Sequence, residues 1–355
     1  MCTATWCTSG TSIRTTRTCG CRRQLWNERG SGPRGSPPGR SRRLGRTARL
    51  IAYFARRSAY MALILILSSI AIFYSLRFAP GDPTGTSLNP LTIASVRQHI
   101  RHELGLDRPV YRQYFDYVGN VFQGDLGHSL VTGASIGELL KTHGKNSLIL
   151  GFTALALSYL IAVPLGVLAA VKRNSWLDQL SMGGAVLGMG IPNFWLALLL
   201  VWLFSLQLGW LPSAGCCSVS QLILPAVVLA AEGTAVTMRM VRASMLEQLN
   251  QEFVRTLRAK GLPEWQIVGR HVLRNALIPV ISLTGLRLGW IVGYTLIVET
   301  IFQWPGVGFL LVDSVLRRDY PVAQFFALLL VFFVVSANWL AEIGYGLANP
   351  RIRRA

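Results

Sequence analysis

The chain has 355 residues, of which 51% are hydrophobic and only 14% charged, and its mean hydropathy is +0.41. This balance excludes an ordinary soluble domain and indicates a polytopic membrane protein. The net charge of +19 does not indicate a nucleic-acid-binding protein, because the cations flank apolar runs and do not form a basic face with interleaved aromatics.

Residues 1–47 are rich in Arg, Gly, Ser, Thr and Pro and lack apolar periodicity, which predicts a disordered basic N-terminal extension before a membrane domain at 48–355. We expect no metal site there, because the cysteines lack paired spacing and no histidine is near them. Those cysteines are Cys2, Cys7, Cys19 and Cys21.

Six runs are long enough to cross a membrane, which takes about 20 apolar residues. They are continuously apolar, so we expect an all-α protein with six transmembrane helices. Lys and Arg precede the first run, follow the second, separate the fourth from the fifth and end the chain; the positive-inside rule therefore places both termini in the cytoplasm. The predicted spans are 58–79, 147–171, 180–206, 222–241, 277–301 and 325–347.

The predicted external loop, 80–146, contains aromatic residues at helical spacing from Tyr111 to Phe122. This pattern predicts an amphipathic helix at the outer surface, which either caps the helix bundle or contacts substrate. Cys216 and Cys217 fall in a later external turn and are assigned no role.

A basic segment, 243–276, separates the fourth and fifth spans. Its apolar stripe predicts one amphipathic cytoplasmic helix. Lys260 falls in the last turn of that helix, Gly261 is suited to ending it, and Pro263 is suited to beginning another. We therefore predict a helical hairpin with a cationic corner; the stripe consists of Leu246, Leu249, Phe253 and Leu257.

Two stretches of this segment, "EFVRTLRAKGL" (252–262) and "RHVLRNALIPV" (270–280), closely resemble the coupling loop of ABC-transporter permeases that import dipeptides and oligopeptides, specifically the B-type subunit. The resemblance covers roughly 48–354. Arg255, Thr256 and Leu257 replace the Glu-Ala-Ala of the wider permease pattern, and Asn349 replaces an aspartate. Other matching stretches are "LGLDRPVYRQYFDYV", "GDLGHSL", "IPNFWLALLL", "LGWLPSAG", "VETIFQWPGVGFLLVDSV" and "NPRIRR".

The resemblance implies a type I ABC importer permease fold and a non-catalytic subunit in the bacterial cytoplasmic membrane. The chain has no GxxxxGK[ST] motif, so ATP and Mg are expected on two partner ATP-binding subunits or domains, and no cofactor on this chain. A second homologous permease and an extracytoplasmic substrate-binding protein complete the expected complex. The resemblance assigns ATPase coupling to Glu252, Phe253, Arg255, Thr256, Arg258, Ala259, Lys260, Gly261 and Leu262.

The expected substrates are di- and oligopeptides; nickel chelates, glutathione and oligosaccharides stay open as alternatives. Glu232 lies about halfway through the fourth span, where it would meet the ammonium group of a passing peptide or hydrogen-bond a neighbouring helix. Other candidates for the substrate pathway are Pro192, Asn193 and Arg287, and the candidate external gate is Trp304, Pro305 and Gly306.

Glu299, near the outer end of the fifth span, is expected to pack against the following turn rather than to act in transport. A passive channel would not explain the hairpin. An intramembrane enzyme is disfavoured, because all five histidines fall in predicted loops and no Ser/His, paired-Asp or HExxH arrangement occurs.

Overall fold

The computed structural model describes residues 41–78 and 108–348, and in these residues it is helical, with no strand and one isolated bridge between His128 and Ser135. This confirms the predicted all-α class. The expectations for residues 1–40, including the four cysteines there, and for Asn349 lie outside the described residues. In chain order the helices are α1 (Ser41–Phe78), α4 (Val110–Phe122), α5 (Ile136–Val171), α6 (Trp176–Gly190), α7 (Asn193–Leu200), the π-helix η1 (Val201–Gln207), α8 (Val219–Leu249), α9 (Glu252–Ala259), α10 (Glu264–Gln266), the π-helix η2 (Ile267–Val272), α11 (Leu273–Ile301), α12 (Val307–Leu316) and α13 (Tyr320–Ala348).

Several helices extend beyond the expected spans. α1 begins at Ser41, before the expected domain boundary, and α5 begins at Ile136, so the loop expected at 80–146 ends earlier than its apolar pattern indicated. By contact the chain divides into the units Met1–Ala48 and Arg49–Ala355, and everything described below belongs to the second.

Among the described residues, four helices are long and apolar enough to cross a membrane, and they correspond to the first, second, fourth and sixth predicted spans. α11 contains the fifth predicted span; at about 1.5 Å per residue its 29 residues would reach about 43 Å, more than the roughly 30 Å of a hydrocarbon core. The four helices are Ala55–Phe78, Ile136–Val171, Val219–Leu249 and Tyr320–Ala341.

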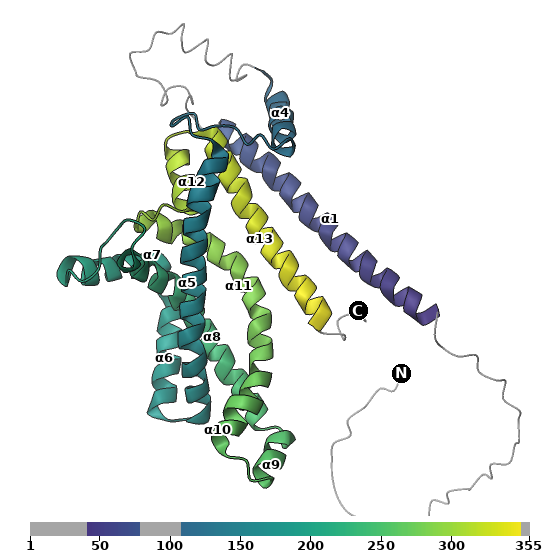
Figure 1. Ribbon diagram of the computed structural model, residues 1–355, viewed down its shortest axis with the longest axis vertical. Helices are drawn as coiled ribbons and strands as arrows, with labels where there is room; N and C mark the ends of the chain where they lie inside the picture. The colour runs from purple at the N-terminus through teal and green to yellow at the C-terminus, as the bar shows by residue number, and fades with distance from the viewer. Residues whose placement is uncertain (1–40, 79–107, 349–355) are drawn as a thin grey trace, which may run out of the picture. The chain divides into compact units, whose positions relative to one another are not determined.

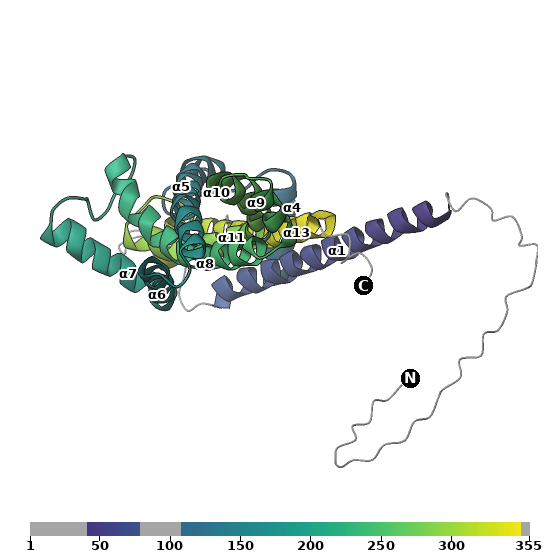
Figure 2. The ribbon, with the colours of Figure 1, turned by 90° about the horizontal axis from the view of Figure 1, so that it is seen from below.

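The third predicted span is broken near its middle, where α6 ends and α7 begins. α6 and α7 meet at 105°, and α7 runs away from α6 in both views (Figures 1 and 2). Pro192 disfavours the helical conformation at Ile191, which is extended with ψ 120°, and the chain turns there. Counted with this bent pair as one span, the described apolar crossings number five.

Two apolar clusters lie at different levels of the bundle. The turn cluster joins α5, α7, α8 and the chain after α11 through Leu150, Ala197, Val228 and Trp304. The hairpin cluster joins α5, α8, α9, η2 and α11, and its buried residues are Ala170, Val241, Met245, Val254, Ile267, Val272, Ala276 and Val280. α9 and α10 lie at one end of the bundle and α12 at the opposite end (Figure 1).

The predicted amphipathic helix in the 80–146 loop is present as α4. Tyr114 packs edge to face on Phe73 of α1, with ring centroids 5.2 Å apart, while Phe115 is 69% exposed. The contact with Phe73 supports the packed-cap alternative for this helix.

Candidate coupling hairpin and translocation site

The 243–276 segment folds as a hairpin, but not with the single helix that its stripe predicted. α8 ends at Leu249 and α9 begins at Glu252, because Gln251 is extended (φ −74°, ψ 152°). The apolar stripe is nevertheless buried on one side of the hairpin, because all four of its residues pack against the hairpin cluster: Leu246, Leu249, Phe253 and Leu257.

The corner of the hairpin is a Schellman motif. Lys260 is the C-cap of α9, and Gly261 adopts the left-handed conformation with φ 76°. The Gly261 N–H donates to the Arg258 carbonyl (2.9 Å) and the Leu262 N–H to the Leu257 carbonyl (3.3 Å), the two bonds that define the motif. The predicted glycine stop is therefore confirmed.

An ion pair closes the corner from outside. Pro263 stands directly before α10, and Glu264 follows it. Arg258 Nε donates to Glu264 Oε1 (2.6 Å) and Nη2 to Oε2 (3.3 Å). This contact lowers the pKa of Glu264 and raises that of Arg258. Both side chains are exposed, so the pair is screened by solvent and shapes the turn more than it stabilises the fold.

The base of the hairpin is fully buried. Val254 of α9, together with Ile267 and Val272 of η2, packs with Val241 and Met245 of α8, and each of the five is 0% exposed. Close-packed interiors transmit displacement rather than absorb it. A force on the hairpin therefore reaches α8, α5 and α11 through this cluster.

The corner, in contrast, is exposed. Of the predicted coupling residues, Phe253 and Leu262 are half-buried, and the other seven are exposed: Glu252, Arg255, Thr256, Arg258, Ala259, Lys260 and Gly261. Trp265, which the sequence reasoning did not single out, is 74% exposed beside them. A bulky aromatic on a polar, cationic hairpin was the signal available, since exposed tryptophans are enriched at binding surfaces.

Glu299 closes the opposite end of the bundle. Its carboxylate is fully buried and accepts from the Ser147 hydroxyl (2.5 Å) and from the backbone N–H groups of Gly308 (2.7 Å) and Phe309 (3.2 Å). It thereby caps α12, whose own N-cap, Gly306, has no side chain. A Cβ on Gly306 would overlap this carboxylate. The expectation that Glu299 belongs to packing is confirmed.

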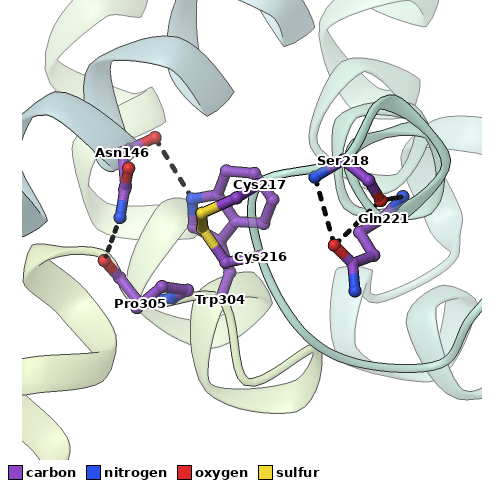
Figure 3. The surroundings of a disulfide bond; sticks show 7 residues. All are labelled: Asn146, Cys216, Cys217, Ser218, Gln221, Trp304 and Pro305. Carbon is purple, nitrogen blue, oxygen red and sulfur yellow. Dashed lines mark hydrogen bonds between the residues drawn. A yellow bond between two sulfur atoms is a disulfide. The ribbon is translucent and has the colours of Figure 1, made fainter.

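The candidate gate is anchored to α5. Trp304 is 3% exposed; its Nε1–H donates to the Asn146 carbonyl (3.1 Å), and the Asn146 amide donates to the Pro305 carbonyl (2.9 Å), as Figure 3 shows. Cys216 and Cys217 form a disulfide beside this indole (Figure 3). The gate role of Trp304, Pro305 and Gly306 stays a prediction.

The pathway candidates lie on helices that pack together. Asn193 is buried at the start of α7, which contacts both α8 and α11. One turn before the bend, Gly188 approaches Ala235 of α8, with a Cβ at Gly188 3.5 Å from that of Ala235. Glu232 lies one turn before Ala235 in α8 and is half-buried. The Tyr294 hydroxyl of α11 lies 3.5 Å from the Glu232 Oε1.

This contact fits the helix-bridging alternative for Glu232, although 3.5 Å is long for a hydrogen bond between oxygens. Arg287 lies in α11, and its side chain is outside the described part of the protein.

The chain matches two known families along most of its length. Residues 162–354 match the family described as "Binding-protein-dependent transport system inner membrane component", and residues 50–135 match "Binding-prot-dependent transport system membrane comp, N-term".

Similar curated proteins are the glutathione transport system permease proteins GsiC. Those of Escherichia coli O6:H1 (strain CFT073) and Escherichia coli (strain K12) are 39% identical over 304 residues, and that of Shigella flexneri serotype 5b is 38% identical. Each alignment covers 86% of this chain and 99% of the relative.

A solved structure of the MetNI methionine ABC transporter in inward-facing conformations is also similar, at 22% identity and a TM-score of 0.49, covering 61% of this chain and 95% of that one. The family resemblance stated from the sequence is confirmed by the family matches and the curated relatives. The chain belongs to the inner-membrane permease family of binding-protein-dependent transport systems, the membrane-embedded subunits of ABC importers.

Proposed function

We propose that this permease imports short peptides across the bacterial cytoplasmic membrane, together with a second homologous permease, two ATP-binding subunits or domains and an extracytoplasmic substrate-binding protein. Its relatives are named for glutathione, which is a tripeptide, so the substrate class includes both glutathione and ordinary di- and oligopeptides. ATP and Mg bind to the partner subunits, since this chain has no phosphate-binding loop.

The observation that carries the proposal is the contrast within the hairpin: an exposed cationic corner on a fully buried base. The corner around Gly261 docks on an ATP-binding subunit. When two such subunits close on ATP, they displace the hairpin, and the hairpin cluster passes that displacement to α5, α8 and α11. The spans then open toward the outside.

The pathway runs beside the bend between α6 and α7, past Pro192, Asn193, Arg287 and Glu232. The Glu232 carboxylate is placed to attract the ammonium end of a peptide, and the contact with Tyr294 is long enough to yield to it. We retain this role as part of the proposal, alongside the helix-bridging contact.

The proposed orientation puts both termini and the hairpin in the cytoplasm and the Cys216–Cys217 turn outside. Labelling tests it in two variants without the four N-terminal cysteines: one keeps Cys216 and Cys217, and the other carries Trp265→Cys as its single cysteine. After reduction by a membrane-impermeant phosphine, an impermeant maleimide should label Cys216 and Cys217 in intact cells, and a cysteine at position 265 only after permeabilisation. Labelling of position 265 in intact cells would reverse the orientation.

The function is tested in proteoliposomes that contain the complete complex, with radiolabelled glutathione and tri-alanine as probes. We expect uptake that requires ATP and the binding protein. Uptake that persists without ATP would indicate a passive channel. Hydrolysis of ATP with movement of neither peptide would refute the substrate class, and nickel chelates or oligosaccharides would be tried next.

The hairpin is tested with Gly261→Asp. The structure offers a matched control, because Gly124 ends α4 in the same way, with φ 85° and Schellman bonds from Gly124 N to the Val121 carbonyl (3.1 Å) and from Asp125 N to the Asn120 carbonyl (3.0 Å). No atom lies within 4 Å of a Cβ at either glycine. Gly261→Asp should abolish uptake while ATP hydrolysis continues, whereas Gly124→Asp should not; equal uptake by both variants would refute coupling through the hairpin.

A further inference from the structure

An ion pair with a buried carboxylate joins α6 to the part of α8 that supports the hairpin. Asp178, in the first turn of α6, is 3% exposed, and Arg242 of α8 meets it with two parallel bonds, Nε to Oδ1 (2.6 Å) and Nη2 to Oδ2 (2.7 Å). This two-bonded geometry fixes direction as well as distance, which a single surface ion pair does not.

Asp178 also organises the connection before α6. Its Oδ2 accepts from the Asn174 N–H (3.0 Å), and its own N–H donates to the Ser175 hydroxyl at the helix N-cap. Asn174 is held in the left-handed region at φ 62°. One carboxylate therefore fixes both the α5–α6 turn and the start of α6 to α8.

Arg242 stands within the helical segment on which the hairpin rests. Val241 directly before it and Met245 three residues later are 0% exposed and belong to the hairpin cluster. On the α5 side, a Cβ at Gly166 would lie 2.8 Å from the Val241 Cβ, so α5 is in close contact at the same level. The ion pair thus adds α6 to a block that already contains the hairpin, α5 and α8.

The other end of α6 is not continuous with α7. α6 ends at Gly190 and the chain bends by 105° into α7, whose buried residue Ala197 belongs to the turn cluster with Trp304. Between these ends, Ala185 of α6 packs with Ala162 of α5 and with Ala235 and Met238 of α8, and Met182 packs against the same apolar cluster. These contacts allow sliding more readily than a two-bonded ion pair does.

We propose that Asp178 and Arg242 are positioning residues for transport: the pair makes α6 move with the coupling hairpin, so that a displacement of the hairpin is delivered to the joint between α6 and α7. The inference rests on the proposed function of the hairpin. Removing Arg242 leaves the buried Asp178 carboxylate without its ion partner, so the intact pair opposes separation of α6 from α8.

The first test measures peptide molecules imported per ATP hydrolysed in the complete reconstituted complex, with the peptide that the wild type carries. Asp178→Asn keeps the size of the side chain and loses the charge, and Arg242→Lys keeps the charge and loses the fork. We expect each to lower this ratio about 2- to 30-fold, the range for residues that modulate coupling without touching a ligand. ATP hydrolysis itself should persist.

The matched control is Asp313→Asn, which breaks an exposed Asp–Arg pair of similar length, Arg317 Nε to Asp313 Oδ1 at 2.8 Å. It should leave the ratio unchanged. A double-mutant cycle with Asp178→Asn and Arg242→Gln should show strong non-additivity, because both substitutions remove one contact.

A second measurement does not depend on whether these variants assemble. Spin labels replace Leu180 of α6, which is 65% exposed, and Arg270 of η2 in the hairpin, which is also exposed. In the otherwise unaltered complex the distance between the labels should stay the same with and without a non-hydrolysable ATP analogue. A shift larger than the width of the distribution would overturn the inference.

The outcomes also separate this inference from the proposed function. A normal ratio in Asp178→Asn beside a lowered ratio in Gly261→Asp overturns the role of the ion pair alone. A normal ratio in both variants overturns the role of the hairpin and the inference that rests on it.

Discussion

Replacing Glu299 should show how far the turn before α12 depends on one carboxylate. Glu299→Ala leaves three donors without an acceptor, namely the Ser147 hydroxyl and the N–H groups of Gly308 and Phe309. An unsatisfied buried donor costs about 1–3 kcal/mol, so the loss is about 3–9 kcal/mol before the cavity is counted. This loss is comparable with the whole free energy of unfolding of a typical protein, which is about 5–15 kcal/mol.

Glu299→Gln should be mild by comparison. An amide oxygen can still accept from the two backbone donors of α12, and the new NH₂ group can face the Ser147 hydroxyl. We expect a loss of about 1–2 kcal/mol, the size of one weakened hydrogen bond.

The assay is thermal unfolding of the purified complex, followed by loss of the monodisperse peak in size-exclusion chromatography. Glu138→Ala is the control, because Glu138 is exposed near the start of α5, the helix that also carries Ser147. We expect the order wild type, Glu299→Gln, Glu299→Ala, with the control near wild type. Equal midpoints for Glu299→Ala and Glu138→Ala would refute the reasoning.

Acidification should break the Arg258–Glu264 ion pair, because the pKa of Glu264 is lowered in the folded hairpin. The stabilisation by this pair is therefore fully present above the ordinary glutamate pKa of about 4.3, and it is lost as the pH falls through the lower pKa of the folded state. The difference in α9 hydrogen-exchange protection between wild type and Glu264→Gln should therefore be constant from pH 5 to 8 and vanish in stronger acid, and a difference that changes between pH 6 and 8 would contradict this assignment. Gly166→Ala should lower the thermal midpoint, because the new Cβ would lie 2.8 Å from the Met238 carbonyl oxygen and from the Val241 Cβ of α8, and such overpacking costs about 1–3 kcal/mol. The control Gly183→Ala should leave the midpoint unchanged, because no atom lies within 4 Å of its Cβ. Trp265→Ala should weaken binding of the ATPase about 5-fold or more in a pull-down titration, because truncating an interface anchor costs more than about 1 kcal/mol. Unchanged binding would remove Trp265 from the docking surface.

Local chemistry explains which parts of the hairpin the sequence could predict. Lys260, Gly261 and Pro263 act on neighbouring backbone, so the stop and restart followed from residue type alone. The single helix expected to continue past Leu249 could not be tested by the stripe alone, because the end of α8 and the short helix α9 present the same apolar stripe to one cluster.

The bend after α6 shows the same limit. Pro192 predicts a lost hydrogen bond wherever it occurs in a helix, but the 105° angle is set by where α7 packs on α8 and α11. The presence of Pro192 is compatible with the position of the break but does not give the size of the angle.

Contacts between distant residues were the least predictable. Asp178 and Arg242 are 64 residues apart, and nothing in either neighbourhood pairs them. Their opposite charges near the ends of consecutive spans were the only signal. Glu299 was easier, because its partners Gly308 and Phe309 follow within ten residues.

The most direct measurement of the central claim places a photo-crosslinking amino acid at Lys260, on the exposed corner, in the transport-competent complex. A matched probe replaces Phe122 of α4, which is 88% exposed at the other side of the proposed membrane. The account predicts that light joins the probe at Lys260 to the ATP-binding subunit and the probe at Phe122 to no ATP-binding subunit. Capture of the ATP-binding subunit at Phe122, or its absence at Lys260 in complexes that import peptide, would contradict it.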